Sequence, residues 1–177
     1  MSQKLTILLT ASILICGFAR AQDSNQTTGQ SIIKTNPIGL MFGSINLTYE
    51  RALSQSTSFQ IGGNFFNKIL GIPVSGIGVN VGYRYYITNA TKPSPEGFYI
   101  GPALSYNSLT ESSTDVTVST VGVGAIIGYQ WVFKSRVTLD LGAGPTYIMG
   151  VGSTTTTTIA SFEGFAPNLS FAVGFNF

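Results

Sequence analysis

The sequence has no histidine and only one cysteine, Cys16, among its 177 residues. These two scarcities remove the usual general acid–base residue, the usual thiol nucleophile and the ordinary ligands of a zinc site. A cation site built from carboxylates alone needs an acidic cluster, and Glu111, Asp115 and Glu163 are too far apart in the chain to indicate one. We therefore expect no catalytic residues, no metal, no cofactor and no enzyme activity.

Charge is also scarce: charged residues make up 9% of the chain, against roughly 25% in an ordinary soluble domain. Hydrophobic residues nevertheless reach 44%. After residue 20 no apolar run approaches the ~20 residues that a membrane-spanning helix needs. A chain that is apolar without a helical span favours a β-barrel or a very apolar β-sandwich.

The first 21 residues have a different character from the rest. Lys4 precedes an apolar stretch over residues 5–18, and Ala19-Arg20-Ala21 has the A-x-A form of a cleavage site. This pattern predicts a secretory signal peptide, 1–21, cleaved after Ala21. Ile15 before Cys16 does not fit a lipoprotein signal, which places a small residue there. The exported chain would contain no cysteine, so we expect it to be stabilised without disulfides, for example by a closed ladder of backbone hydrogen bonds.

Without Lys4 and Arg20, seven basic and seven acidic residues are left, so the remaining chain has no net charge. No basic patch points to a nucleic-acid partner. Residues 22–30 are polar and without a pattern, and we expect a flexible N-terminal segment there.

The clearest periodicity is at the end of the chain, from Leu169 to Phe177. Odd positions are Leu, Phe, Val, Phe and Phe, and even positions are small or polar. Such alternation predicts a β-strand with one apolar face. Similar stretches occur at 31–42, 44–53, 57–66, 76–88, 97–107, 117–133 and 137–150. We expect an all-β protein over 31–177, an eight-stranded antiparallel up-and-down transmembrane β-barrel with apolar side chains facing lipid.

The expected connections test this arrangement. Transmembrane barrels have short periplasmic turns and longer external loops. With a periplasmic N-terminus, the segments 67–75, 108–115 and 151–165 would be external loops, and 54–56 and 134–136 would be short turns. The segment 89–96 is longer than this rule favours, and the expected tight hairpin at Gly43-Ser44 is shorter. Pro37, Pro102 and Pro145 lie inside expected strands, where we expect bulges and irregular ladders.

Aromatic residues gather at the expected strand ends, which indicates girdles at the two lipid–water boundaries. Strand propensity alone would also enrich them in strands. The predicted girdle residues are Tyr83, Tyr85, Phe98, Tyr129, Trp131, Phe133, Tyr106 and Tyr147.

The leader, the eight spans and the terminal Phe171, Val173, Phe175 and Phe177 together resemble the small outer-membrane barrels of Gram-negative bacteria, the group of the OmpA transmembrane domain, OmpX and OmpW. The segments 47–53 (LTYERAL) and 82–86 (GYRYY) are similar to a branch of such barrels common in Bacteroidetes. The resemblance implies location in the outer membrane, contact with its lipid, and recognition of the four terminal residues by the barrel-assembly machinery. We expect a monomer.

Four charged residues occupy inward positions of expected strands: Lys34, Glu50, Arg84 and Asp140. Each lies near the same end of the barrel if neighbouring strands alternate in direction. The interior of an eight-stranded barrel is just wide enough for side chains to fill, and buried charges must pair. We expect a salt-bridged polar plug, completed by hydrogen bonds from Gln60, Tyr99 and Gln130. The alternative is four unrelated solvated charges that line a wet cavity or protrude past the rim of the barrel.

These features favour a non-enzymatic outer-membrane barrel with a structural or surface-interaction role and a largely plugged lumen. One alternative is a passage for small hydrophobic compounds, as in OmpW-like barrels. Another is a secreted lipocalin-like carrier, which would need an apolar pocket inside and a polar surface outside.

Overall fold

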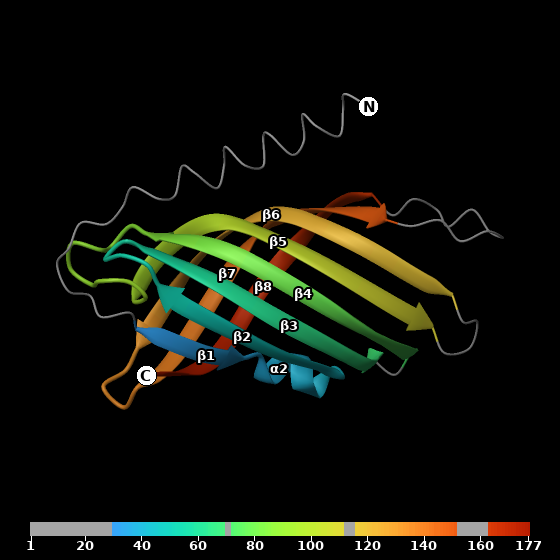
Figure 1. Cartoon of the computed structure of the whole chain (residues 1–177), viewed down its shortest axis with the longest axis horizontal. Coiled ribbons are helices and arrows are strands. Elements are labelled where there is room, and N and C mark those ends of the chain that lie inside the picture. Colours follow the sequence, from blue (N-terminus) through green and yellow to red (C-terminus); the bar gives the residue numbers. More distant parts are fainter. Residues whose placement is uncertain (1–29, 70–71, 112–115, 152–162) are drawn as a thin grey trace, which may run out of the picture.

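The computed structural model describes residues 30–69, 72–111, 116–151 and 163–177. Within these residues eight strands form one closed barrel in sequence order, and every strand is antiparallel to its neighbours, including β1 and β8. Figure 1 shows the tilted strands wrapping around one axis, with the C-terminus at one end of the barrel. The prediction of an all-β, eight-stranded, up-and-down barrel is confirmed. No helix among the described residues is long and apolar enough to span a membrane.

The strands and the single described helix have the following bounds: β1 Ser31–Thr35, α2 Pro37–Met41, β2 Ser44–Ala52, β3 Thr57–Ile69, β4 Ile72–Tyr86, β5 Gly97–Glu111, β6 Thr117–Val132, β7 Val137–Val151 and β8 Gly164–Asn176. We call the end of the barrel that holds Ser31 and Phe177 the terminal end, and the opposite end the loop end. The connections after β2, β4 and β6 lie at the terminal end.

The side chains follow the predicted alternation around the whole barrel. In β4, for example, Ile77, Val79 and Tyr85 are exposed on the outer face, while Arg84 and Tyr86 are buried inside. Other strands expose Leu47, Ile61, Leu104, Val123, Leu141 and Phe175 in the same way. The barrel therefore has an apolar outer surface, and its polar and small residues face the lumen.

The first expected strand, 31–42, is wrong beyond Thr35. Asn36 has an extended backbone, its side chain accepts a hydrogen bond from the Gly39 N–H, and Pro37 occupies the first turn of α2. An asparagine N-cap followed by proline starts a helix, because proline cannot donate to a sheet ladder but fits the first helical turn. The expected tight hairpin at Gly43-Ser44 is also wrong, since α2 and Gly43, whose φ is 83°, connect β1 to β2.

The connection between β3 and β4 is much shorter than the expected loop 67–75. The two strands continue to Ile69 and from Ile72, and the pairing Ile69↔Ile72 follows a register shift after Asn67. β5 is longer than expected, ending at Glu111, and β8 begins at Gly164 and not at 169. The sequence does not indicate these strand ends, because residues such as Asn67 and Thr110 are polar and interrupt the apolar alternation. They nevertheless pair with the neighbouring strands.

The prolines in β5 and β7 interrupt the ladders without inserting a residue. β4 and β5 pair as Gly82↔Ala103 and again as Tyr85↔Ile100, which is one register on both sides of Pro102. β6 and β7 show the same gap beside Pro145. The prediction of irregular ladders at Pro102 and Pro145 is confirmed, whereas the prediction of bulges there is wrong. At Gly101 an added Cβ would collide with the Tyr83 carbonyl, so glycine before Pro102 lets the two strands approach.

Candidate functional site

The lumen near the terminal end is filled by a layer of polar side chains, which we call the polar cluster. Seven of the eight strands supply it: its members are Lys34 (β1), Glu50 (β2), Ser58 (β3), Arg84 and Tyr86 (β4), Tyr99 (β5), Gln130 (β6) and Asp140 (β7). Each is 2% exposed or less. Strand tilt and register bring residues more than 100 positions apart into one cross-section of the barrel.

The four charged members form a closed ring of alternating charge. Lys34 Nζ lies 2.5 Å from Glu50 Oε2 and 2.8 Å from Asp140 Oδ2. Arg84 lies between the same two carboxylates, at 3.3 Å from Glu50 Oε2 and 2.7 Å from Asp140 Oδ2. Two cations and two anions give no net charge. Each ion therefore has two opposite partners, which is the condition for burying charges at tolerable cost.

Neutral side chains satisfy the outer sides of the two carboxylates. The Tyr86 hydroxyl donates to Glu50 Oε1 over 2.7 Å, and Ser58 donates to the same oxygen. The Tyr99 hydroxyl donates to Asp140 Oδ1 over 2.7 Å. The Arg84 guanidinium also lies 3.9 Å from the centre of the Tyr99 ring, a cation–π contact.

Gln130 links the two cations and the end of the barrel. Its Oε1 accepts from Lys34 Nζ at 3.0 Å and from Arg84 at 3.2 Å. Its Nε2 donates to the carbonyl oxygen of Pro95, in the connection between β4 and β5, over 2.5 Å. The side chain thereby ties the charged ring to a loop that lies outside the strands.

That connection, residues 87–96, packs beneath the polar cluster at the terminal end. Ser94 and Pro95 are fully buried, and Ser94 donates from its backbone to Gln55 and from its hydroxyl to Thr57. On its outer side Lys92 donates to Glu96 over 2.6 Å, and this hydrogen bond raises the pKa of the Lys92 ammonium. The unusual length of the connection thus has a structural reason: it folds into the mouth of the barrel.

Glycines on the inner face make room for the large members of the polar cluster. An added Cβ at Gly128 or Gly142 would lie 2.5 or 2.6 Å from the Tyr99 hydroxyl. β8 contributes no polar side chain to the cluster, and an added Cβ at its Gly174 would lie 2.6 Å from Lys34 Cγ. These glycines are needed for space, because a barrel this narrow cannot hold a further side chain beside them.

Above the polar cluster, toward the loop end, the lumen opens into a cavity of about 350 Å³. Lys34, Arg84 and Asp140 contribute to its lining. Amides and hydroxyls supply the other polar groups of its wall: Asn36, Asn46, Thr48, Gln60, Asn64, Asn80, Ser105, Asn107, Thr120, Thr146, Asn168 and Ser170. The barrel interior is therefore filled at one end and hollow at the other, where uncharged polar groups share the wall with apolar side chains such as Leu104, Ile126 and Ile148.

Of the residues predicted for the plug, the structure brings together Lys34, Glu50, Arg84, Asp140, Tyr99 and Gln130. Gln60 lies in the wall of the cavity, beside Gly82. Sequence reasoning missed Ser58, Tyr86 and Pro95. The alternation of the strands places Ser58 and Tyr86 on the inner face, so it could have indicated both. The position of Pro95 at the barrel mouth has no corresponding pattern in the sequence.

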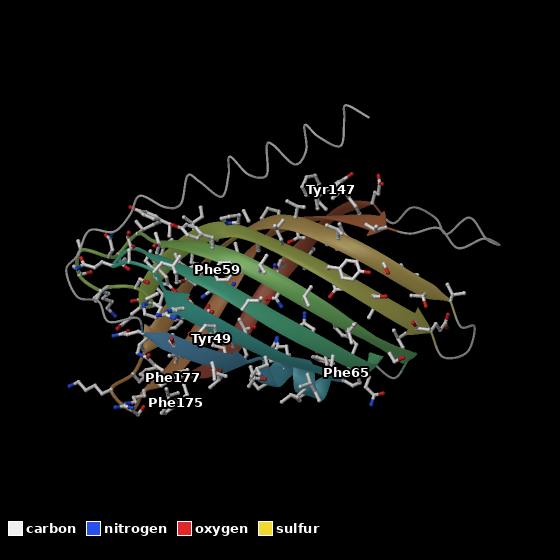
Figure 2. All side chains as sticks on the ribbon, viewed as in Figure 1. Tyr49, Phe59, Phe65, Tyr147, Phe175 and Phe177 are labelled. Atoms are coloured by element: carbon white, nitrogen blue, oxygen red, sulfur yellow. The ribbon has the colours of Figure 1, made fainter. Side chains whose placement is uncertain are left out.

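The predicted girdle and terminal residues lie on the outer face. Phe175 and Phe177 lie at the terminal end, and Phe65 and Tyr147 lie toward the loop end (Figure 2). The rings of Tyr129 and Trp131 are in tilted contact with their centres 4.5 Å apart, and those of Tyr147 and Phe165 meet edge to face at 5.1 Å. The remaining members of these two sets are exposed or half-buried: Tyr83, Tyr85, Phe98, Phe133, Tyr106, Phe171 and Val173.

The donor set of the lumen is suited to holding charges and hydrogen bonds in place. In the described ranges no group of three or more His, Cys, Asp and Glu residues could hold a metal ion. Both carboxylates of the polar cluster are already saturated by protein donors. The members of the cluster thus bind one another, and the groups available to a ligand are the amides and hydroxyls above it.

The fold and the lumen define a small antiparallel β-barrel with an apolar outside and a polar, partly filled inside. More particularly, the chain belongs to the DUF3575 family, described as a protein of unknown function, whose model matches residues 7–154. No curated protein matches the chain. No solved structure matches it either.

Proposed function

We propose that this chain is an exported, non-enzymatic barrel of the bacterial outer membrane, with a structural or surface-interaction role and a lumen closed to ions. The observation that carries the proposal is the polar cluster, which crosses the lumen from β1 to β7 with paired charges. A water-filled channel would leave such charges separately hydrated, whereas here they neutralise one another in a layer that side chains fill.

The outer surface supports the membrane part of the proposal. Large apolar side chains are exposed on all eight strands, and soluble monomers rarely expose contiguous apolar surface on this scale. A lipid environment accommodates the same surface, and wherever the strands pair, the barrel satisfies its backbone groups internally. The short connections after β2 and β6 suit the periplasmic side. The predicted signal peptide and the loop residues 152–162 lie outside the described residues.

The two alternatives fit the lumen less well. A passage for hydrophobic compounds needs a continuous apolar path, but in this cavity amides and hydroxyls alternate with apolar side chains such as Ile126 and Ile148, and charges form the floor. A lipocalin-like carrier needs an apolar interior and a polar exterior, and this barrel has the opposite arrangement.

Two measurements on the full chain test the proposal, one on the membrane fraction and one on purified protein. Heat-modifiable gel mobility of the membrane fraction tests the membrane barrel, and a protein found only in the soluble fraction would contradict it. Conductance in planar lipid bilayers tests the closure. We expect no stable channels from the folded wild type, and well-resolved channels from heat-modifiable wild-type protein would contradict the closed lumen.

Assembly is tested at the C-terminus. If Phe177 is read by the barrel-assembly machinery, its deletion should lower the amount of protein in the outer membrane several-fold. The matched control is Phe133→Ala, an exposed aromatic at the same end of the barrel but outside the terminal strand. Unchanged levels after deletion of Phe177 would rule out this role.

A further inference from the structure

The barrel wall is incomplete where α2 replaces the second half of the first strand. β8 begins at Gly164, but it pairs with β1 only from Val173 to Asn176. β2 begins at Ser44, but its first residue paired with β1 is Thr48. Each of these two segments lacks a partner only on the side that faces β1. Between them lies α2, which contacts both β2 and β8. Figure 1 shows α2 beside the start of β2, displaced from the wall.

The edge of β8 that faces this gap carries backbone groups without a strand partner. Phe177 exchanges hydrogen bonds with Ser31, whereas Asn176 donates to Arg136 on the β7 side. Because backbone direction alternates along a strand, the backbone groups of 165, 167, 169 and 171 point toward α2. Within the described part of the chain no strand pairs with this edge. Residue 167 is proline, which has no N–H to leave unsatisfied.

The most exposed large apolar side chains of the described residues lie on the two elements that border this gap, α2 and β8. Met41 in α2 is 83% exposed, and Phe165 and Leu169 in β8 are 81% and 76% exposed. The next value is 64%, at Ile77 on the opposite part of the wall. A side chain on a complete barrel wall is covered by neighbours from both adjacent strands. Leu169 and Phe165 have a strand neighbour only on the β7 side, and together with Met41 of α2 they form an apolar rim. We call the gap and its rim the lateral notch.

The lumen cavity reaches the wall at this place. Its lining includes seven consecutive residues of β8, from Ala166 to Ala172. No other strand contributes more than three consecutive residues. Outward residues Pro167, Leu169 and Phe171 are among the seven, so the cavity meets the strand along its free edge and on both of its faces. Asn36 and Asn46 border the opposite side, where Asn46 Oδ1 accepts the Asn36 N–H over 2.6 Å.

The chemistry of the two parts differs and is complementary to an amphiphile. The uncharged wall offers amides such as Asn80 and Asn107 beside apolar side chains such as Ile126, and the charges on the floor are balanced. Such groups suit a headgroup rich in hydroxyls or amides and give no net attraction to an ionic one. The notch offers Met41, Phe165 and Leu169, which suit an alkyl chain.

We infer that the lateral notch admits a membrane amphiphile with an uncharged, hydroxyl- or amide-rich headgroup, which enters the cavity while its alkyl chain stays along β8 and α2. The inference rests on the proposed membrane placement and gives the closed barrel a ligand class. A cavity of about 350 Å³ is at the lower end of the ligand-site range, so it holds one compact headgroup of monosaccharide size.

The test uses the full chain folded in lipid nanodiscs and observed by NMR. The probes are n-octyl β-D-glucoside below its micellar concentration, free glucose, and octyl sulfate, which has the same chain with an anionic headgroup. Met41 reports on the notch through its methyl group, and the indole N–H of Trp131, at the terminal end of β6, is the internal control. The side-chain amides of Asn80 and Asn107 report on the cavity.

The expected result is a saturable shift of Met41, Asn80 and Asn107 with octyl glucoside, and no saturable shift of the Trp131 indole. Free glucose and octyl sulfate should leave the two amides unchanged. Asn80→Leu should weaken glucoside binding about tenfold, which corresponds to the loss of one hydrogen-bonding group. The matched control Asn67→Leu changes an exposed asparagine on the outer face and should not affect binding. If Asn80→Leu does not fold, Asn107→Leu tests the same wall from β5.

Three results would overturn the inference. Equal amide shifts with free glucose would mean entry from the loop end. A Met41 shift with both octyl compounds and no amide shift would mean contact of the chain with an apolar surface only. No saturable shift with octyl glucoside would mean no such site. Each can occur while the barrel remains heat-modifiable and non-conducting, so none of them is confused with failure of the proposed function.

Discussion

The two halves of the lumen are built from the same strands but filled differently. In the terminal half, long side chains such as Arg84, Tyr99 and Lys34 cross the interior, and Gly128, Gly142 and Gly174 make room for them. In the loop half, short amides lie along the wall: an added Cβ at Gly62 would lie 2.8 Å from the Asn80 side chain. The comparison shows that side-chain length, at constant strand number, decides whether a narrow barrel is filled or hollow.

The largest effect is expected from breaking the charge balance of the terminal half. Glu50→Ala removes the acceptor of Lys34, Arg84, Ser58 and Tyr86 and leaves an unbalanced buried cation. We expect a loss of about 3–5 kcal/mol in the free energy of unfolding, measured by urea titration of the folded band on gels.

The matched control for this prediction is Glu96→Ala, which removes the partner of Lys92 on the outside of the barrel. That pair is partly exposed and should contribute less than about 1 kcal/mol. Equal losses in the two variants would show that burial of the polar cluster is not what makes Glu50 important.

An intermediate effect is expected from filling the space that glycine leaves for Tyr99. In Gly128→Val the new side chain meets both the Tyr99 ring and the Leu141 carbonyl, so the polar cluster must shift. We expect a destabilisation of about 1–3 kcal/mol, as for other overpacked interiors, in the same urea titration.

Gly63→Val is the control, because nothing lies within 4 Å of a Cβ added at Gly63 on the outer face. This variant should be neutral or slightly more stable, since valine favours strands. If Gly63→Val lost as much stability as Gly128→Val, the cost would come from strand glycines in general and not from the packing of Tyr99.

The smallest effect is expected in the loop half. Asn107→Ala removes one amide from a half-buried wall that borders a cavity, so water can replace its hydrogen bonds. We expect a change within about 1 kcal/mol and no channel activity in planar bilayers. A loss as large as that of Glu50→Ala would erase the contrast between the two halves.

The sequence predicts most of the wall, because a period of two along a strand fixes which side chains face out and which face in. Lys34, Glu50, Arg84 and Asp140 were placed on the inner face by this parity alone. Their meeting in one layer depends also on strand stagger, which alternation does not specify. The same stagger places Gln60 in the cavity wall and Tyr86 in the polar cluster.

The parts that alternation does not describe were mispredicted or missed. α2 is apolar on all sides, so it reads as a continuation of the strand, although Asn36-Pro37 is a helix-start signal. The burial of Pro95 depends on a loop folding back on the barrel, a long-range contact without local pattern. The missed helix α2 lies in the barrel wall, and the missed contact of Pro95 lies at the barrel end. The lateral notch results from α2 taking the place of a strand.

The central claim is that the paired charges of the terminal half close the lumen. Single-channel recording tests it most directly by comparing two double variants, each first shown to be folded by heat-modifiable mobility. Arg84→Ala/Asp140→Ala removes one cation and one anion together, so no net charge is left buried. Asn80→Ala/Asn107→Ala removes two side chains from the cavity wall. We predict stable channels from the first variant and none from the second; channels from both, or from neither, would contradict the claim.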